Sequence, residues 1–148
     1  MKNLINDTAR PQLLNVQVTA IPKIGTNGKV NYETTFTPES LKVTEPDTII
    51  NYQLIDPTPS DVRFKSLSIK PDDSDQFSIP SISGSGKLVT FSDANTAKAK
   101  FNISIKFTDK DQQEFIVDPE VDNDPKRLTA EPLKMVMLEP EPDNDPKR

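Results

Sequence analysis

Apolar and polar residues alternate with a period of two along much of residues 13–117. The alternation is cleanest in residues 14–20, 30–36 and 101–107. Successive side chains of a β-strand point to opposite faces, so each segment predicts a half-buried strand. Residues 48–54 carry apolar side chains on both faces, which predicts a central strand. Nowhere do apolar residues keep a helical spacing over three turns.

Turn-forming residues separate these segments. Pro22 is expected to end the first strand, and Gly25-Thr26-Asn27-Gly28 predicts a turn. The apolar parity changes between Phe64 and Leu67, which predicts a β-bulge or a strand that changes sheets. Further short strands are expected at residues 41–43, 77–79, 88–91 and 114–117. Together they predict an all-β, immunoglobulin-like antiparallel β-sandwich of about seven to nine strands, with a closed barrel as the less natural alternative.

The net charge of −5 is concentrated near the C-terminus. Residues 1–117 carry 13 basic and 14 acidic side chains, whereas residues 118–148 carry five basic and nine acidic ones. Binding to nucleic acid or to an anionic membrane depends on clustered Lys and Arg, and the chain has no such cluster. We therefore expect neither partner. The first residues lack a signal-peptide pattern and no apolar run is long enough to cross a membrane, so a cytoplasmic location is expected.

An acidic, proline-bearing sequence occurs twice. We call residues 118–127 the acidic block and residues 139–148 the second block; they agree at eight of ten positions. Prolines lack an N–H, so the acidic block is expected to pair along a sheet edge, if at all. The apolar run Leu133–Leu138 between the two blocks could add an edge strand or dock on the body. We predict a single domain over residues 1–125 and an extended tail over residues 126–148.

Composition excludes several chemistries. The chain has no Cys and no His, so thiolate nucleophiles, disulfides and the usual zinc sites are absent. The Ser83-Gly84-Ser85-Gly86 sequence lacks a base and the flanks of a nucleophile elbow, so we expect a hairpin connection. Catalysis could still use a pair of carboxylates, but nothing in the sequence selects one. A carboxylate-based hydrolase is thus the last choice, and no catalytic residue or cofactor is assigned.

The acidic block could bind a cation. Asp118, Glu120, Asp122 and Asp124 alternate along the chain, and an extended backbone would place all four on one face, as Ca²⁺ ligands. The EF-hand pattern fails, however, because Asn123 replaces the turn glycine. The alternative is that these are solvated turn acids, with Asn123 capping nearby backbone groups in an Asx turn.

The strand pair of residues 101–117, followed by Asp118-Pro119-Glu120-Val121-Asp122-Asn123-Asp124-Pro125, resembles the DP-EP family of uncharacterised bacterial proteins. The resemblance covers most of residues 10–125. It implies an immunoglobulin-like or cupredoxin-like sandwich and no assigned activity. We therefore expect a non-enzymatic binding or structural module that self-associates or binds another protein. A Ca²⁺-dependent module is the alternative.

Overall fold

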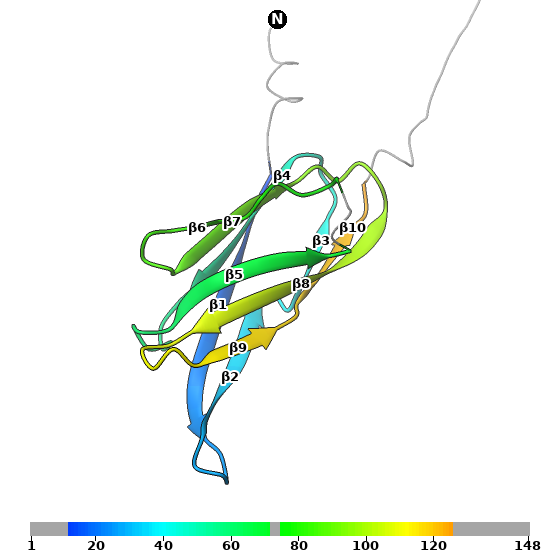
Figure 1. The fold of residues 1–148 in the computed structure, drawn as a ribbon. Helices are drawn as coiled ribbons and strands as arrows, with labels where there is room; N and C mark the ends of the chain where they lie inside the picture. The colour runs from blue at the N-terminus through cyan, green and yellow to red at the C-terminus, as the bar shows by residue number, and fades with distance from the viewer. Residues whose placement is uncertain (1–11, 72–74, 126–148) are drawn as a thin grey trace, which may run out of the picture.

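The computed structural model describes residues 12–71 and 75–125, which form ten strands in two sheets that face each other (Figure 1). The strands are β1 (Leu13–Ile24), β2 (Val30–Thr37), β3 (Ser40–Val43), β4 (Thr48–Leu54), β5 (Arg63–Lys70), β6 (Ser81–Ile82), β7 (Leu88–Asp93), β8 (Ala99–Thr108), β9 (Glu114–Val117) and β10 (Glu120–Asn123). One sheet has the order β2-β1-β4-β7-β6. The other has the order β3-β10-β8-β5, and β9 pairs with the later part of β8.

The predicted all-β sandwich is confirmed, with two differences. The described residues hold ten strands rather than seven to nine, because β6 has only two residues and β10 lies within the acidic block. Two strand pairs, β1–β4 and β3–β10, are parallel, so both sheets are mixed rather than wholly antiparallel. Period-two alternation is the same in both pairings, so the sequence pattern could not distinguish them.

Inward-facing side chains from both sheets form one hydrophobic core. In β8, Phe101, Ile103, Ile105 and Phe107 are all buried, as their alternation predicts. Aromatic rings pack within each sheet: Tyr52 stacks on Phe91 in one sheet, and Phe64 lies against Phe107 in the other with 5.2 Å between ring centroids. The buried core residues are Val16, Val18, Ala20, Leu41, Val43, Ile50, Tyr52, Leu54, Val62, Phe64, Val89, Phe91, Ile103, Ile105, Phe107 and Val121.

Two strands, β5 and β1, contain irregularities that the sequence had signalled. The register of β5 against β8 shifts between Phe64 and Ser66, so the predicted β-bulge is confirmed. The expectation that Pro22 ends the first strand is wrong: β1 continues through it to Ile24. Pro22 lies beyond the part of β1 that pairs with β4, so only β2 flanks it, and a proline is tolerated there.

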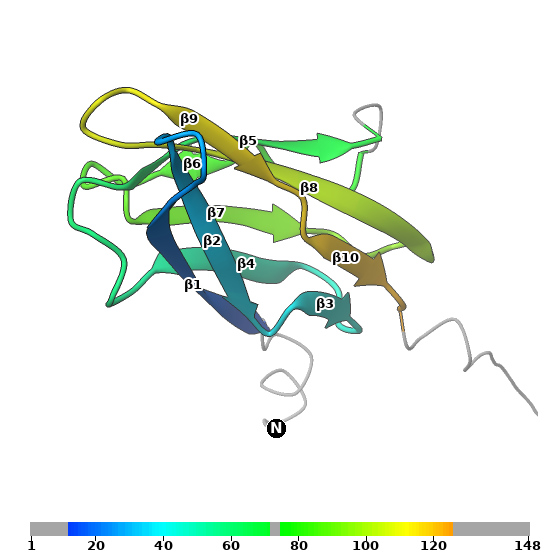
Figure 2. The same cartoon turned by 90° about the horizontal axis from the view of Figure 1, so that it is seen from below.

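Figure 2, a view from below, shows β10, the last described strand, beside β3 and β8. Residues 126–148, with the second block and the apolar run Leu133–Leu138, lie outside the described residues, so the predicted division at residue 125 stays a prediction. No helix long and apolar enough to cross a membrane occurs in residues 12–71 and 75–125.

Candidate functional site

Residues 120–123 of the acidic block form an interior strand, which corrects the expected edge position. β10 lies between β3 and β8, pairing in parallel with β3 and antiparallel with β8. This is possible because Pro119 and Pro125 flank the four-residue strand and neither needs to donate within it. Val121 and Asn123 point inward and are fully buried, so the block closes part of the core.

The four candidate metal ligands, Asp118, Glu120, Asp122 and Asp124, lie at alternate positions on the outward side of the chain, but their carboxylates do not come together around one point. Alternate side chains of a strand are about 7 Å apart, whereas Ca²⁺ holds its oxygens at about 2.3–2.6 Å. Asp124 contacts Lys98 Nζ at 3.2 Å and Lys42 Nζ at 3.3 Å, and these lysines lower its pKa. Within the described part of the chain, no three Asp or Glu side chains form a group that could hold a metal ion.

The buried side of β10 carries polar chemistry that the sequence did not reveal. Asn123 does not form the expected local Asx turn; its Nδ2 donates to Asp93 Oδ1 of β7 at 2.9 Å, which links the two sheets. The backbone N–H of Asn95 donates to the same oxygen at 3.0 Å. Asn95 Nδ2 donates to the carbonyls of Val43 and Glu45. All three side chains are almost completely buried.

This buried cluster has more acceptors than donors. Among the described residues, Asp93 Oδ2, Asn95 Oδ1 and Asn123 Oδ1 are buried without a hydrogen-bond partner. Burial raises the pKa of Asp93, and the hydrogen bonds from Asn123 and Asn95 offset only part of that rise. The Asp93 carboxyl therefore takes up a proton more readily than an exposed aspartate, because the proton supplies a donor where one is lacking.

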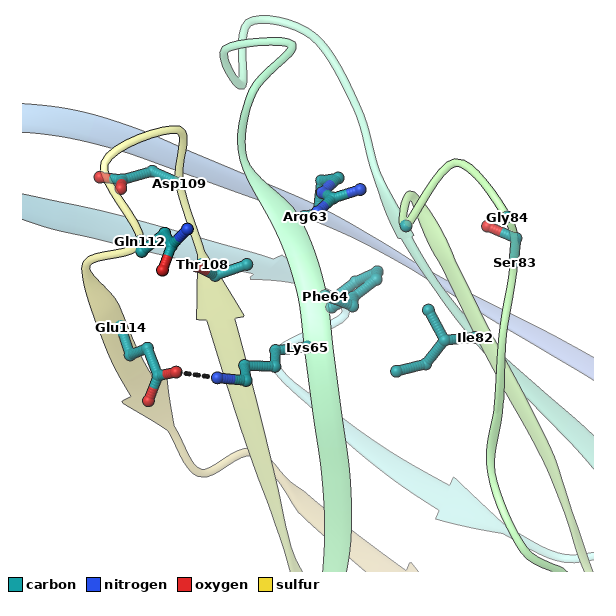
Figure 3. A pocket seen from close by; sticks show the side chains of 11 residues that line it. Arg63, Phe64, Lys65, Ile82, Ser83, Gly84, Thr108, Asp109, Gln112 and Glu114 are labelled. Atoms are coloured by element: carbon teal, nitrogen blue, oxygen red, sulfur yellow. Dashed lines mark hydrogen bonds and ion pairs between the residues drawn. The ribbon is translucent and has the colours of Figure 1, made fainter.

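A polar pocket of about 430 Å³ lies between β5, the β6–β7 turn and the β8–β9 turn (Figure 3). We call it the hairpin pocket. In Figure 3, Lys65 extends from β5 toward Glu114, while Ile82 and Ser83 lie on the opposite side of β5. Glu114 is hydrogen-bonded to Lys65 and lies 3.7 Å from Lys106, and these lysines lower its pKa.

Both oxygens of the other carboxyl of the hairpin pocket, that of Asp109, accept hydrogen bonds. Asp109 accepts hydrogen bonds from the Tyr32 hydroxyl at 2.8 Å and from the N–H groups of Asp111 and Gln113. Burial raises the pKa of Asp109, but these donors outweigh it and hold the pKa below its ordinary value. Neither Asp109 nor Glu114 therefore has the raised pKa that suits a general acid at neutral pH.

The Ser-Gly-Ser-Gly sequence forms the β6–β7 hairpin connection, as predicted. The Gly86 N–H donates to the Ser83 carbonyl at 2.9 Å, and Gly86 has a φ of 75°. A Cβ at Gly86 would lie 2.7 Å from Arg63 Cβ, so the turn packs closely on β5. In the described residues, no carboxylate lies within ion-pair distance of Arg63.

An apolar groove lies beside β5, between this strand and the segment that leads into β6. We call it the side groove; it has a volume of about 220 Å³ and is lined by Leu67, Ser68, Ile69, Pro71, Phe77, Ser78, Ile79 and Pro80. Leu67 and Ile69 belong to β5, and Phe77 and Ile79 come from the segment that leads into β6. Ile79 is 91% exposed, the highest value among the exposed large apolar side chains of the described residues.

β5 is the last strand of its sheet, and its outer backbone groups face this groove. The Ile103 N–H donates to the Pro119 carbonyl at 2.8 Å, so Ile103 turns its backbone groups toward the β10 side of β8. Ile69 is paired with Ile103 from the other side, so it turns its own N–H and C=O away from β8, and Leu67 does the same. We call these groups of Leu67 and Ile69 the open edge.

Comparison with protein families now adds an independent observation: the model of the DP-EP family matches residues 12–125. The chain belongs to the DP-EP family. The match begins just before β1 and ends two residues after β10, so the DP-EP unit coincides with the sandwich. A search of curated proteins found no match to this DP-EP chain.

Sequence reasoning identified the acidic block but missed both the buried cluster and the side groove. Nothing in the local sequence links Asp93 and Asn95 to Asn123, which is 28 to 30 residues away. A signal for the side groove was present in Ile79-Pro80, because a proline after an apolar residue interrupts strand pairing.

Proposed function

We propose that this DP-EP chain is a non-enzymatic protein-binding module that takes an extended strand of a protein partner along the open edge of β5. The partner strand comes from a second copy of the chain or from a different protein. The observation that carries the proposal is the open edge beside the side groove. An incoming strand finds backbone donors and acceptors at Leu67 and Ile69, and an apolar trough for alternate side chains.

The exposure of Ile79 supports this mode of binding. An aliphatic side chain that is 91% exposed contributes nothing to the folded core but becomes buried when a strand fills the side groove. Burying one such side chain contributes about 1.5–3 kcal/mol. Long open edges favour uncontrolled aggregation, and Lys65 and Lys70 give this one the charges that commonly limit it.

The hairpin pocket supports a non-enzymatic role. Its two carboxyls are held by Lys65, Lys106 and Tyr32, and lowered pKa values keep them ionised. Ser83 Oγ lies 3.1 Å from Ser85 Oγ, which is no base. We therefore do not propose a hydrolase, and the separated carboxylates of the acidic block favour no Ca²⁺-dependent function.

Peptide binding tests the proposal. The probe is a labelled peptide in which three aliphatic residues alternate with threonines and a run of glutamates follows. It is titrated by fluorescence anisotropy with the full chain carrying Met135→Asp, so that the apolar run Leu133–Leu138 does not compete with the probe. Ile79→Asp should weaken binding by at least about tenfold, equivalent to 1.4 kcal/mol. Ile24→Asp is the matched control, because Ile24 is 81% exposed and lies at the end of β1 outside the side groove. Equal affinity of the two variants would overturn the proposal.

A further inference from the structure

The apolar run Leu133–Leu138 matches the proposed site in several respects. We infer that, in the absence of a partner, residues 133–138 of the same chain lie along the open edge of β5 and cover the side groove. The inference rests on the proposed function and deepens it, because the chain then carries its own occupant. A partner strand must displace that occupant, so the run regulates the site.

The distance that the chain must cover supports an occupant from the same molecule. Lys70 of β5 and Glu120 of β10 pair with Asn102 from opposite sides of β8, so β10 begins level with the end of β5 and continues in the same direction. The outer side of β5 lies three strand spacings from β10, about 14 Å, and Pro125 lies five residues past Glu120, about 17 Å. The straight distance from Pro125 to the outer side of β5 at Lys70 is therefore about 22 Å. The eight residue steps from Pro125 to Leu133 span about 26 Å, so the chain is long enough to reach this edge.

The direction of approach fixes the orientation. The run reaches β5 at its Lys70 end and must continue back toward Arg63, antiparallel to β5. Alternate residues then face the side groove. The set Leu133, Met135 and Met137 is entirely apolar, whereas the other set contains Lys134, so the first set faces inward.

Charge complementarity supports the same placement. β5 exposes Arg63, Lys65 and Lys70, and among the described residues neither Arg63 nor Lys70 has an ion-pair partner. The run is preceded by Glu131, and the second block that follows begins with acidic side chains at alternate positions. An antiparallel run places Glu131 near Lys70 and the start of the second block near Arg63, at the hairpin pocket.

A tethered occupant also has a large concentration advantage. A short linker holds a segment at a millimolar effective concentration, so even a weak contact fills the site. Free partner strands at micromolar concentration must then compete with the run. Substitutions that remove the run from the side groove should therefore strengthen binding of an external strand.

The test uses two full-length variants and the peptide probe described above. Met135→Asp places a charge in the side groove, whereas Val136→Asp places the same charge on the outward side of the run. Met135→Asp should bind the probe at least about tenfold more tightly than the wild-type chain, equivalent to 1.4 kcal/mol. Val136→Asp should bind like the wild type. In NMR hydrogen exchange without the probe, the Leu67 and Ile69 amides should be protected in the wild-type and Val136→Asp chains and exposed in Met135→Asp.

Each other outcome is decisive. If the probe binds all three chains equally and the two amides exchange freely in each, the inference is overturned while the proposed function stands. If protection falls on dilution as a dimer dissociates in sedimentation, the run comes from a second copy, which also overturns the inference. If the probe binds none of the chains and the amides are protected only when Met135 is intact, the inference stands and the proposed function fails.

Discussion

Replacement of Asp93 by asparagine tests the buried cluster that joins the two sheets. The variant keeps the acceptor that Asn123 Nδ2 and the Asn95 N–H use. It also replaces the unpartnered Oδ2 by an amide nitrogen that can donate to Asn95 Oδ1 or Asn123 Oδ1, both unpartnered in the described structure. The substitution therefore supplies a donor in a cluster that lacks one, at almost unchanged volume.

The expected gain follows from the cost of an unsatisfied buried group. That cost is about 1–3 kcal/mol, so Asp93→Asn should raise the free energy of unfolding at pH 7 by about that amount. Burial raises the pKa of Asp93 in the folded chain above its unfolded value of about 3.9. The stability linked to this carboxyl is therefore fully present below pH 3.9 and is lost as the pH rises through the folded pKa. The gain in the variant should be near zero at about pH 3 and should increase as the pH rises toward 7.

Urea unfolding followed by far-UV circular dichroism at pH 3, 5 and 7 measures this gain. Asp124→Asn is the control of opposite sign, because Lys98 and Lys42 lower the pKa of Asp124. Its carboxylate stabilises the fold above the unfolded pKa and loses that effect as the pH falls through the folded pKa, so this variant should lose stability at pH 7 but not at pH 3. If Asp93→Asn were destabilised equally at every pH, both the missing donor and the raised pKa of Asp93 would be refuted.

Three further predictions concern the hairpin pocket and the acidic block. Tyr32→Phe removes the hydroxyl that donates to Asp109 and should lower the free energy of unfolding by about 1.5–3 kcal/mol at neutral pH. The loss should shrink in acid as Asp109 titrates through its lowered pKa. Urea unfolding measures this loss, and a loss independent of pH would contradict the prediction. Gly86→Ala should lower the free energy of unfolding by about 1–3 kcal/mol, because Gly86 has a positive φ and a Cβ there would contact Arg63. Gly84→Ala should be nearly neutral, because a Cβ at Gly84 would have nothing within 4 Å. Thermal unfolding measures both variants, and similar losses would refute the packing argument. The melting temperature should be the same in millimolar Ca²⁺ as in EDTA, because the carboxylates of the acidic block do not converge. A real site at 100 times its dissociation constant would stabilise the fold by about 2.7 kcal/mol. A Ca²⁺-selective rise of several degrees would therefore show that the acidic block does bind the ion.

Local patterns predicted much of the sandwich. Alternation identified β8 and its four buried apolar residues, and the parity change between Phe64 and Leu67 located the bulge in β5. Both depend on period-two geometry, which is a property of the single strand. The central place of β4, between β1 and β7, followed from its apolar content.

Features that depend on contacts between residues far apart in the sequence could not be predicted from local patterns. The bond from Asn123 to Asp93 joins different sheets across 30 positions of sequence. Pro22 and the acidic block were misplaced because proline was treated as a breaker, whereas its effect depends on which neighbours flank it. The exposure of Ile79 likewise depends on how the segment before β6 lies beside β5, which no local pattern encodes.

The most direct test of strand binding at β5 follows the backbone amides of β5 by NMR while the peptide probe is added to the full-length Met135→Asp chain, in which these amides are expected to be exposed beforehand. The account predicts that the Leu67 and Ile69 amide protons gain protection from exchange and shift, because they face outward. The Ser68 amide, which faces β8, should change little. Changes confined to β2 or to the hairpin pocket, with Leu67 and Ile69 unaffected, would contradict the account.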